Sequence, residues 1–309
     1  MRVAVMGSGG VGGYFGGRLA AAGAAVTFIA RGAQFHAIRE QGLRIQSELG
    51  DLAIVVPVCD EPREAGPVDL VILSVKMWDT ETAIKAIAPL MTGRTAVMSL
   101  QNGVTKDDAL REAFGSERVV GALCYIGAAI ADPGVIKHTG KLQRIVLGEY
   151  GGRLSERVTA FAELCRRAAI DVEVSADIKR AVWEKFVFLV GFSGATSVIR
   201  QPIGPIRSNP AARALLAALF AEAADVGRAS GVQIPGDFAE NRLAFCDTLH
   251  PAFTSSMHGD LERGGRLEIP WLQGVVSDLG SHVGIPTPAN NFVRDILSLY
   301  VDGPPVVPA

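Results

Sequence analysis

The chain opens with Met1-Arg2-Val3-Ala4-Val5-Met6-Gly7-Ser8-Gly9-Gly10-Val11-Gly12, and this stretch decides the fold. A short apolar run leads directly into a turn in which Gly7, Gly9 and Gly12 have the spacing G-x-G-x-x-G. In such a turn the first glycine allows the sharp bend, the second lets the backbone approach a pyrophosphate, and the third lets the next helix pack closely. A helix-like run follows over residues 14–22, so its first N–H groups would face the phosphates. We therefore predict a dinucleotide-binding site made of Gly7, Ser8, Gly9, Gly10, Val11 and Gly12.

The next predicted strand, residues 25–31, indicates which dinucleotide binds. A site for NAD usually carries Asp or Glu near the end of this strand, where the carboxylate accepts a hydrogen bond from the ribose 2′-hydroxyl. Here Arg31 stands at that end, and a guanidinium can hold a 2′-phosphate through charge-assisted hydrogen bonds. The sequence therefore favours NADP(H), and the alternative is that Arg31 is a solvated loop residue.

Length and composition limit the class of protein. A chain of 309 residues, 49% hydrophobic and 20% charged, is typical of a folded α/β protein with two domains. The net charge is −2 and the basic residues are scattered, so the sequence shows no basic stripe that would bind nucleic acid. We expect no signal peptide and no membrane span, and the four cysteines form no C-x-x-C pair, which favours a cytoplasmic location.

Strand-like and helix-like runs alternate up to about residue 150. The apolar, β-branched runs span residues 68–75, 95–100, 119–124 and 144–148. This alternation predicts a Rossmann-like, doubly wound α/β domain with a parallel sheet over residues 1–174. Ligands bind beyond the carboxyl ends of such strands, so we expect Lys76, Asn102 and the segment 126–129, with Ala128, to line the cofactor site.

The pattern changes after residue 174. Over residues 175–309 apolar residues recur three and four apart, which predicts a mostly α-helical second domain. Its most apolar stretch, residues 186–199, is interrupted by glycines and serines, so we expect a buried helix rather than a membrane span. Cys246 and His250 are the one His/Cys pair at one-turn spacing, and without further ligands we predict no metal site.

Several further segments carry a family resemblance. With the glycine turn and Arg31, the segments Ser74-Val75-Lys76-Met77-Trp78 and Ser99-Leu100-Gln101-Asn102-Gly103 resemble the ketopantoate reductase family, the NADPH-dependent 2-dehydropantoate 2-reductases. The resemblance covers nearly the whole chain. In the second domain, Ile178-Lys179-Arg180-Ala181-Val182-Trp183-Glu184-Lys185-Phe186 looks like the family's W-x-K helix. Ser255-Ser256-Met257 and Leu267-Glu268-Ile269 resemble its later motifs.

The resemblance implies an activity and roles for the residues. The activity is reduction of 2-dehydropantoate (ketopantoate) to pantoate with NADPH, as in pantothenate biosynthesis, by a cytoplasmic enzyme that is a homodimer. Lys185 would donate the proton, and Glu268 would orient Lys185. The hydride would go to the ketone carbon. Asn102 and Ser256 would hold the substrate and the nicotinamide.

One feature departs from the family. Leu189 and Ser193, four and eight residues after Lys185, should share its helix stripe and line the substrate site. The family carries asparagines there that bind ketopantoate, and a buried substrate group without such a partner costs about 1–3 kcal/mol. Two alternatives stay open: a paralogue that reduces another 2-oxo acid, with a more apolar chain against Leu189, or a non-catalytic NADP(H)-binding sensor.

Overall fold

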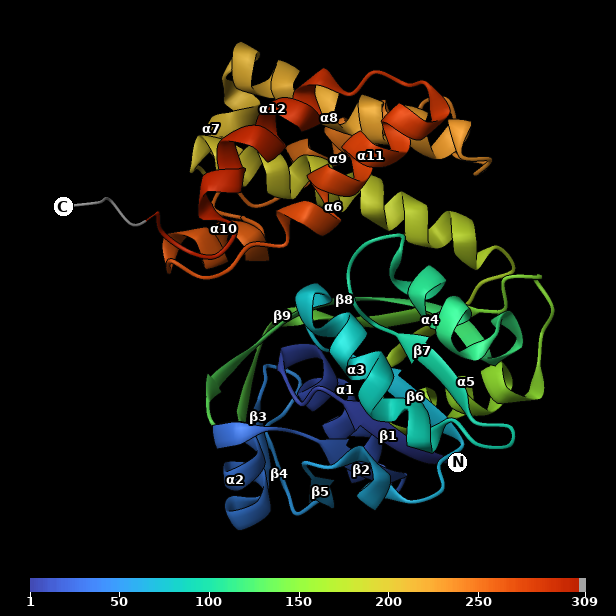
Figure 1. The fold of residues 1–309 in the computed structure, drawn as a ribbon. Helices are drawn as coiled ribbons and strands as arrows, with labels where there is room; N and C mark the ends of the chain where they lie inside the picture. The colour runs from blue at the N-terminus through green and yellow to red at the C-terminus, as the bar shows by residue number, and fades with distance from the viewer. Residues whose placement is uncertain (306–309) are drawn as a thin grey trace. The chain divides into compact units, whose positions relative to one another are not determined.

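The computed structural model describes residues 1–305 and divides into two compact units, Met1–Ala181 and Val182–Ala309 (Figure 1). The strands of the first unit are β1 (Arg2–Met6), β2 (Ala25–Ile29), β3 (Leu43–Gln46), β4 (Leu52–Ile54), β5 (Val58–Cys59), β6 (Leu70–Leu73), β7 (Ala96–Ser99), β8 (Val119–Asp132), β9 (Val135–Gly148) and β10 (Asp171–Val174). Its helices are α1 (Gly10–Ala21), α2 (Gly32–Gln41), α3 (Thr80–Ile87), α4 (Lys106–Phe114) and α5 (Glu156–Arg167).

The predicted parallel sheet is present. Strands β5-β2-β1-β6-β7-β8 lie side by side in that order, and each neighbouring pair is parallel. The order reverses direction at β1, because β2 follows on one side and β6 on the other. That reversal is the switch point at which doubly wound sheets bind ligands. The carboxyl ends of β2, β1, β6 and β7 therefore form one edge that carries the predicted cofactor residues.

A long hairpin corrects the prediction for the end of this domain. Strands β8 and β9 have 14 residues each and pair antiparallel, so the predicted strands 119–124 and 144–148 were too short. Segment 126–129 consequently lies within β8 instead of following it. Gly134, in the turn between the strands, has a φ of +76°, which suits glycine. β9 also pairs with β3 and β10, and β4 pairs antiparallel with β3, so the full sheet is mixed.

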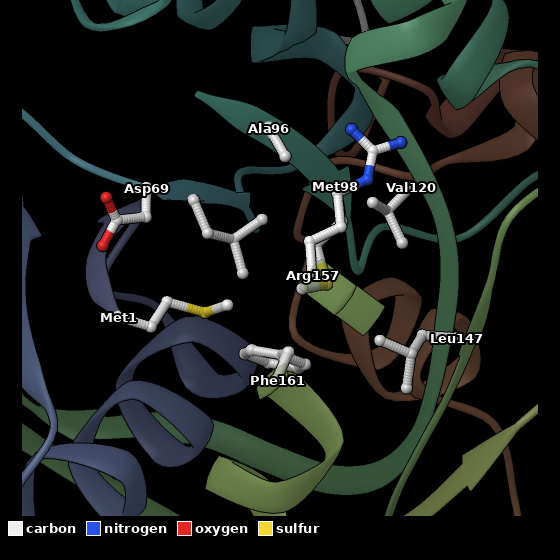
Figure 2. Close-up of a pocket in the computed structure, with 9 residues that line it drawn as sticks. Met1, Asp69, Ala96, Met98, Val120, Leu147, Arg157 and Phe161 are labelled. Atoms are coloured by element: carbon white, nitrogen blue, oxygen red, sulfur yellow. The ribbon is translucent and has the colours of Figure 1, made fainter. Parts of the chain in front are cut away.

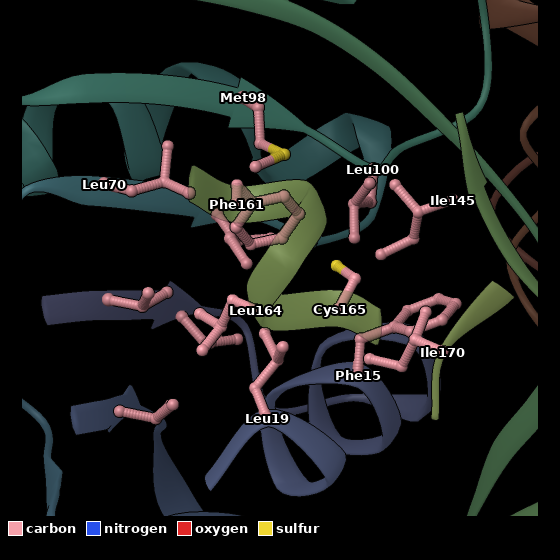
Figure 3. Packing of buried hydrophobic residues seen from close by; sticks show 14 of the residues in the cluster. Phe15, Leu19, Leu70, Met98, Leu100, Ile145, Phe161, Leu164, Cys165 and Ile170 are labelled. Atoms are coloured by element: carbon pink, nitrogen blue, oxygen red, sulfur yellow. The ribbon is translucent and has the colours of Figure 1, made fainter. Parts of the chain in front are cut away.

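Helices cover both faces of the sheet. On one face α1 and α5 bury Phe15, Leu19, Phe161 and Leu164 against the strands, with the packing shown in Figure 3. On the other face α3 and α4 bury Ala83, Ile87 and Leu110. The strands of the parallel sheet are buried on both sides, which is why they are continuous apolar runs without polar alternation.

The regular elements of the second unit are helical, as predicted. They are α6 (Ile178–Ile199), α7 (Ile203–Ser208), α8 (Pro210–Ala229), α9 (Phe238–Thr248), α10 (Ser256–Glu262), α11 (Gln273–Val283) and α12 (Pro288–Leu297). The division between the units falls near the start of α6. Within residues 1–305, α6 is the one helix long and apolar enough to cross a membrane. Yet 67% of its apolar window is buried inside the protein, which agrees with the predicted core helix.

Candidate functional site

The glycine turn lies between β1 and α1. Gly7 has a φ of +99°, which only glycine adopts readily, and its N–H donates to the carbonyl of Ile29 at 3.1 Å. Ser74, just after β6, donates its hydroxyl to the carbonyl of Gly7 at 2.8 Å. The turn is thus held by the ends of both strands that flank β1. α1 begins at Gly10, four residues before the predicted start, because the turn itself runs into the first helical turn.

The glycines of the turn differ in what surrounds them. A Cβ atom on Gly12 would lie 2.1 Å from the carbonyl oxygen of Gly7 and 2.2 Å from the hydroxyl of Ser74. A Cβ atom on Gly10 would lie 2.2 Å from the carbonyl oxygen of Ala128 in β8. At Gly9, in contrast, no heavy atom of the described residues lies within 4 Å of the Cβ position beyond its immediate chain neighbours. The open side of the turn is therefore at Gly9, where the motif places a pyrophosphate.

The start of α1 suits an anion. No side chain of residues 1–305 caps this helix, and its first turn carries no acidic residue. Gly9, its N-cap, has an extended backbone, and the first helical hydrogen bond there runs from the Gly13 N–H to the Gly9 carbonyl. The N–H groups of the first turn and the positive end of the helix dipole are thus available to a phosphate. The residues present fit the pyrophosphate of a dinucleotide.

Arg31 is close to this turn in the fold. β2 ends at Ile29, two residues earlier than predicted, and Arg31 becomes the N-cap of α2. Its side chain is exposed and makes no hydrogen bond or ion pair with any residue from 1 to 305. Gln34 in α2 donates its amide to the carbonyl of Ser8 at 2.8 Å and accepts from the N–H of Gly134 at 2.9 Å. Gln34 therefore fixes α2 to the glycine turn, a contact that the sequence did not predict.

The two residues after β6 and β7 lie where the sequence placed them. Lys76 is exposed, with its ammonium 5.5 Å from the centre of the Trp78 ring. Asn102 is half-buried and follows β7. Its neighbour Gln101 is buried and donates its amide to the carbonyl of Val75 at 2.9 Å and to the Thr80 hydroxyl at 2.8 Å. Gln101 thus joins the loops after β6 and β7 and positions both Lys76 and Asn102.

A buried lysine also holds the end of β7, from which the loop with Asn102 begins. Lys106, the first residue of α4, is 1% exposed. Its ammonium donates to the carbonyls of Ser99 at 2.9 Å and Ala122 at 2.8 Å, and it pairs with the carboxylate of Asp107 at 3.1 Å. The hydroxyl of Tyr150 also donates to Asp107, and burial raises the pKa of Tyr150 above its usual range. No sequence signal marks Lys106, because a lysine that begins a helix is usually exposed.

The second unit carries the other predicted residues. Lys185 and Leu189 are half-buried on α6, while Ser193 is 1% exposed and donates its hydroxyl to the carbonyl of Leu189 at 2.5 Å. Ser256 is the exposed first residue of α10. The preceding Ser255 is buried and shares a hydrogen bond of 2.8 Å with Thr196 of α6, so this loop lies beside α6.

Glu268 comes from a separate segment of the second unit. It is 8% exposed and precedes the short 3-10 helix η5 (Ile269–Trp271), whose last residue donates its N–H to the Glu268 carbonyl at 3.1 Å. Among residues 1–305, no group of three or more His, Cys, Asp or Glu side chains could hold a metal ion. Cys246, half of the predicted one-turn pair, is fully buried, and burial raises the pKa of its thiol to about 12.

Two cavities of the first unit lie near the amino ends of the parallel strands, away from the edge that carries the glycine turn. One has a volume of about 10 Å³, the lower limit of the space that one water molecule needs. It is lined by residues of β6, β7 and β8 together with Met1, Leu147, Arg157 and Phe161 (Figure 2). The other, of about 270 Å³, is lined by residues near the starts of β1 and β2. Neither touches the glycine turn, Lys76 or Asn102. These cavities are therefore separate from the candidate cofactor site.

Comparison with known proteins gives a consistent family. A family model described as ketopantoate reductase PanE/ApbA matches residues 3–152, and the model of its C-terminal part matches residues 177–301. An uncharacterized oxidoreductase of Bacillus subtilis, YkpB, is 31% identical over 97% of this chain and 99% of its own length. A 2-dehydropantoate 2-reductase of Mesorhizobium japonicum is 31% identical over 95% of each chain.

Solved structures agree with these relatives. The PanE/ApbA family ketopantoate reductase from Ralstonia eutropha JMP134 is 32% identical and superposes with a TM-score of 0.89, covering 97% of this chain and 98% of the other. A 2-dehydropantoate 2-reductase from Geobacter metallireducens is 31% identical with the same TM-score. The resemblance predicted from the sequence motifs is therefore confirmed.

Proposed function

The chain belongs to the ketopantoate reductase family of oxidoreductases, and from that premise we propose that it reduces 2-dehydropantoate to pantoate with NADPH and with Lys185 as proton donor. The observation that carries the proposal is the open glycine turn at the start of α1, with Gly9 unobstructed and no capping side chain among the described residues. The reaction would serve pantothenate biosynthesis. We also propose that the protein is a cytoplasmic homodimer, which sedimentation of the purified protein would test.

The cofactor would be held by the first unit. The backbone N–H groups of Ser8, Gly9, Gly10 and Val11 would bind the pyrophosphate, and Arg31 would pair with the 2′-phosphate of NADPH. Lys76 would lie along the ribose and phosphate, and Ala128, whose carbonyl faces Gly10, would border the site from β8. Asn102, held in place by Gln101, would donate its amide to the nicotinamide side or to the substrate.

When bound, NADPH supplies the hydride that the ketone carbon accepts. The Lys185 ammonium donates the proton that the ketone oxygen gains. The hydride on carbon and this proton on oxygen together convert the C=O group into CH–OH. Before the transfer the positive charge of Lys185 stabilises the negative charge that develops on this oxygen. The carboxylate of Glu268 would orient the ammonium, and Ser256 would hold the substrate carboxylate. A small 2-oxo acid is thus the class of substrate.

Steady-state kinetics test this proposal. NADPH absorbance is followed with ketopantoate for the wild type, for Lys185→Met, which keeps the length of the side chain, and for Lys185→Arg. Loss of the proton donor should lower kcat by about 10²- to 10⁴-fold. The affinity for NADPH, measured by its fluorescence, should stay at the wild-type value in both variants.

Two outcomes would contradict the proposal. A wild-type kcat in Lys185→Met would remove Lys185 from the reaction. NADPH binding without turnover of any 2-oxo acid would favour the sensor instead of the enzyme.

A further inference from the structure

Beyond Lys185, the same face of α6 carries Leu189 and Phe192 together with two hydroxyl side chains. Leu189 lies one turn after Lys185 and is half-buried, so part of its side chain is accessible. Phe192 and Ser193 follow one further turn along the same face. The opposite face of α6 packs within the second unit: Gln273 of α11 donates its amide to the carbonyl of Val190 at 2.9 Å. A Cβ atom on Gly194 would lie 2.6 Å from that amide nitrogen.

The hydroxyl groups on the Lys185 face are already used by the protein. Ser193 donates to the carbonyl of Leu189 at 2.5 Å and is 1% exposed. Thr196, fully buried, bonds to the carbonyl of Phe192 and to Ser255, both at 2.8 Å. The Ser255 hydroxyl in turn accepts from the N–H of His258 at 3.1 Å, because it caps α10. α6 therefore offers no accessible hydroxyl to a substrate that extends from Lys185 along the helix.

An aromatic side chain continues this apolar face. Phe253 lies in the loop before α10, and its ring centre is 5.4 Å from that of Phe192. Phe253 is 48% exposed, although it is large and apolar. It stands three residues before Ser256, which is exposed at the start of α10. Phe192 itself is only 3% exposed, so the accessible part of this apolar surface, which we call the α6 apolar face, is made by Leu189 and Phe253, beside the segment that carries Ser256.

We infer that this enzyme prefers 2-oxo acids whose side chain is purely apolar over those whose side chain carries a hydroxyl. The inference rests on the proposed function, in which the ketone oxygen meets Lys185 and the rest of the substrate lies along α6. A substrate hydroxyl that faces the α6 apolar face would leave water without gaining a partner, whereas a methyl group there would be buried favourably. The discrimination that such a site achieves is about 10- to 100-fold.

A matched pair of substrates tests the inference. Trimethylpyruvate has the carbon skeleton of ketopantoate and lacks only its hydroxyl, so the ratio of the two kcat/KM values isolates that group. With NADPH and the intact wild-type protein, kcat/KM should be about 10- to 100-fold higher for trimethylpyruvate. Leu189→Asn, which puts an amide on the α6 apolar face, should lower this ratio by about tenfold or more.

The control makes the same chemical change elsewhere. Leu299→Asn alters a leucine that is 66% exposed and distant in sequence from α6, and it should leave the ratio at the wild-type value. If Leu189→Asn does not fold, the wild-type ratio by itself still decides. Equal or faster turnover of ketopantoate by the wild type would overturn the inference and leave the proposed function intact. Turnover of neither compound, nor of other 2-oxo acids, would instead remove the proposed function.

Discussion

Gly9 and Gly12 lie three residues apart, yet the same substitution meets different surroundings at each. The Cβ position of Gly9 is open and its backbone is extended, with φ −75° and ψ −165°, so Gly9→Ala should change the free energy of unfolding by less than about 0.5 kcal/mol. In Gly12→Ala the new methyl would overlap the Gly7 carbonyl, which should cost about 1–3 kcal/mol. Urea denaturation measures both values.

The Gly9→Ala variant also separates cofactor binding from stability. A methyl at Gly9 would occupy the place of the pyrophosphate, so Gly9→Ala should weaken NADPH binding by about tenfold or more, or ~1.4 kcal/mol. Fluorescence titration with NADPH measures this. Wild-type affinity in a folded Gly9→Ala protein would show that the pyrophosphate does not approach this glycine.

Arg31 should decide between the two nicotinamide cofactors. Its guanidinium is exposed and has no polar partner among residues 1–305, so Arg31→Leu should not disturb the fold. Loss of charge-assisted hydrogen bonds to the 2′-phosphate should raise the KM for NADPH by about 10- to 100-fold and leave the KM for NADH nearly unchanged. Arg39→Leu, an exposed arginine on the same helix whose guanidinium lies over the Phe35 ring, is the control. An equal effect on both cofactors would assign Arg31 another role.

At the scale of elements, an ion pair joins the end of β9 to the start of α5. Glu149 accepts from both Nε and a terminal nitrogen of Arg157 at 2.7 Å and from the Ser155 hydroxyl at 2.6 Å. Burial raises the pKa of Glu149, but these hydrogen bonds outweigh burial and hold the pKa below its ordinary value of 4.5. The contact therefore stabilises the fold fully above that value, and the stabilisation is lost as the pH falls through the lowered pKa.

Acid titration of stability tests this contact. Glu149→Gln should destabilise the protein by about 1–3 kcal/mol at neutral pH, and the difference from the wild type should shrink as the medium becomes acidic. Urea denaturation across the pH range measures it. Glu163→Gln, on the exposed face of α5, is the control and should produce no such trend. A destabilisation that stays constant into acid would mean that the charge of Glu149 is not what stabilises the contact.

At the scale of the whole molecule, we expect cofactor binding and proton transfer to depend on residues of different units. The proposed cofactor residues belong to Met1–Ala181, whereas Lys185 belongs to Val182–Ala309. NADPH at one hundred times its dissociation constant should stabilise the wild type by about 2.7 kcal/mol. Thermal unfolding should show the same gain in Lys185→Met and a much smaller one in Gly9→Ala at the same NADPH concentration. Loss of the gain in Lys185→Met would place Lys185 in cofactor binding rather than in proton transfer.

The local features of this protein could be predicted from the sequence by itself. The glycine turn, the alternation of strands and helices and the helical second unit were predicted correctly, because each depends on residues close together in the chain. The positions of Lys76 and Asn102 followed as well, since in a parallel sheet the residues after neighbouring strands meet at one edge. The family resemblance rested on these same short motifs.

Contacts between distant segments were decided only by the tertiary structure. The pairing of β8 with β9 placed segment 126–129 inside a strand and brought the Ala128 carbonyl against Gly10. The burial of Lys106 depends on carbonyls of two strands that the sequence around it does not reveal. Likewise, the sequence leaves the Ser193 hydroxyl open to a substrate, whereas packing within the second unit leaves this residue only 1% exposed. Sequence periodicity reports which residues become buried, whereas the partner each polar group finds there depends on segments that only folding brings together.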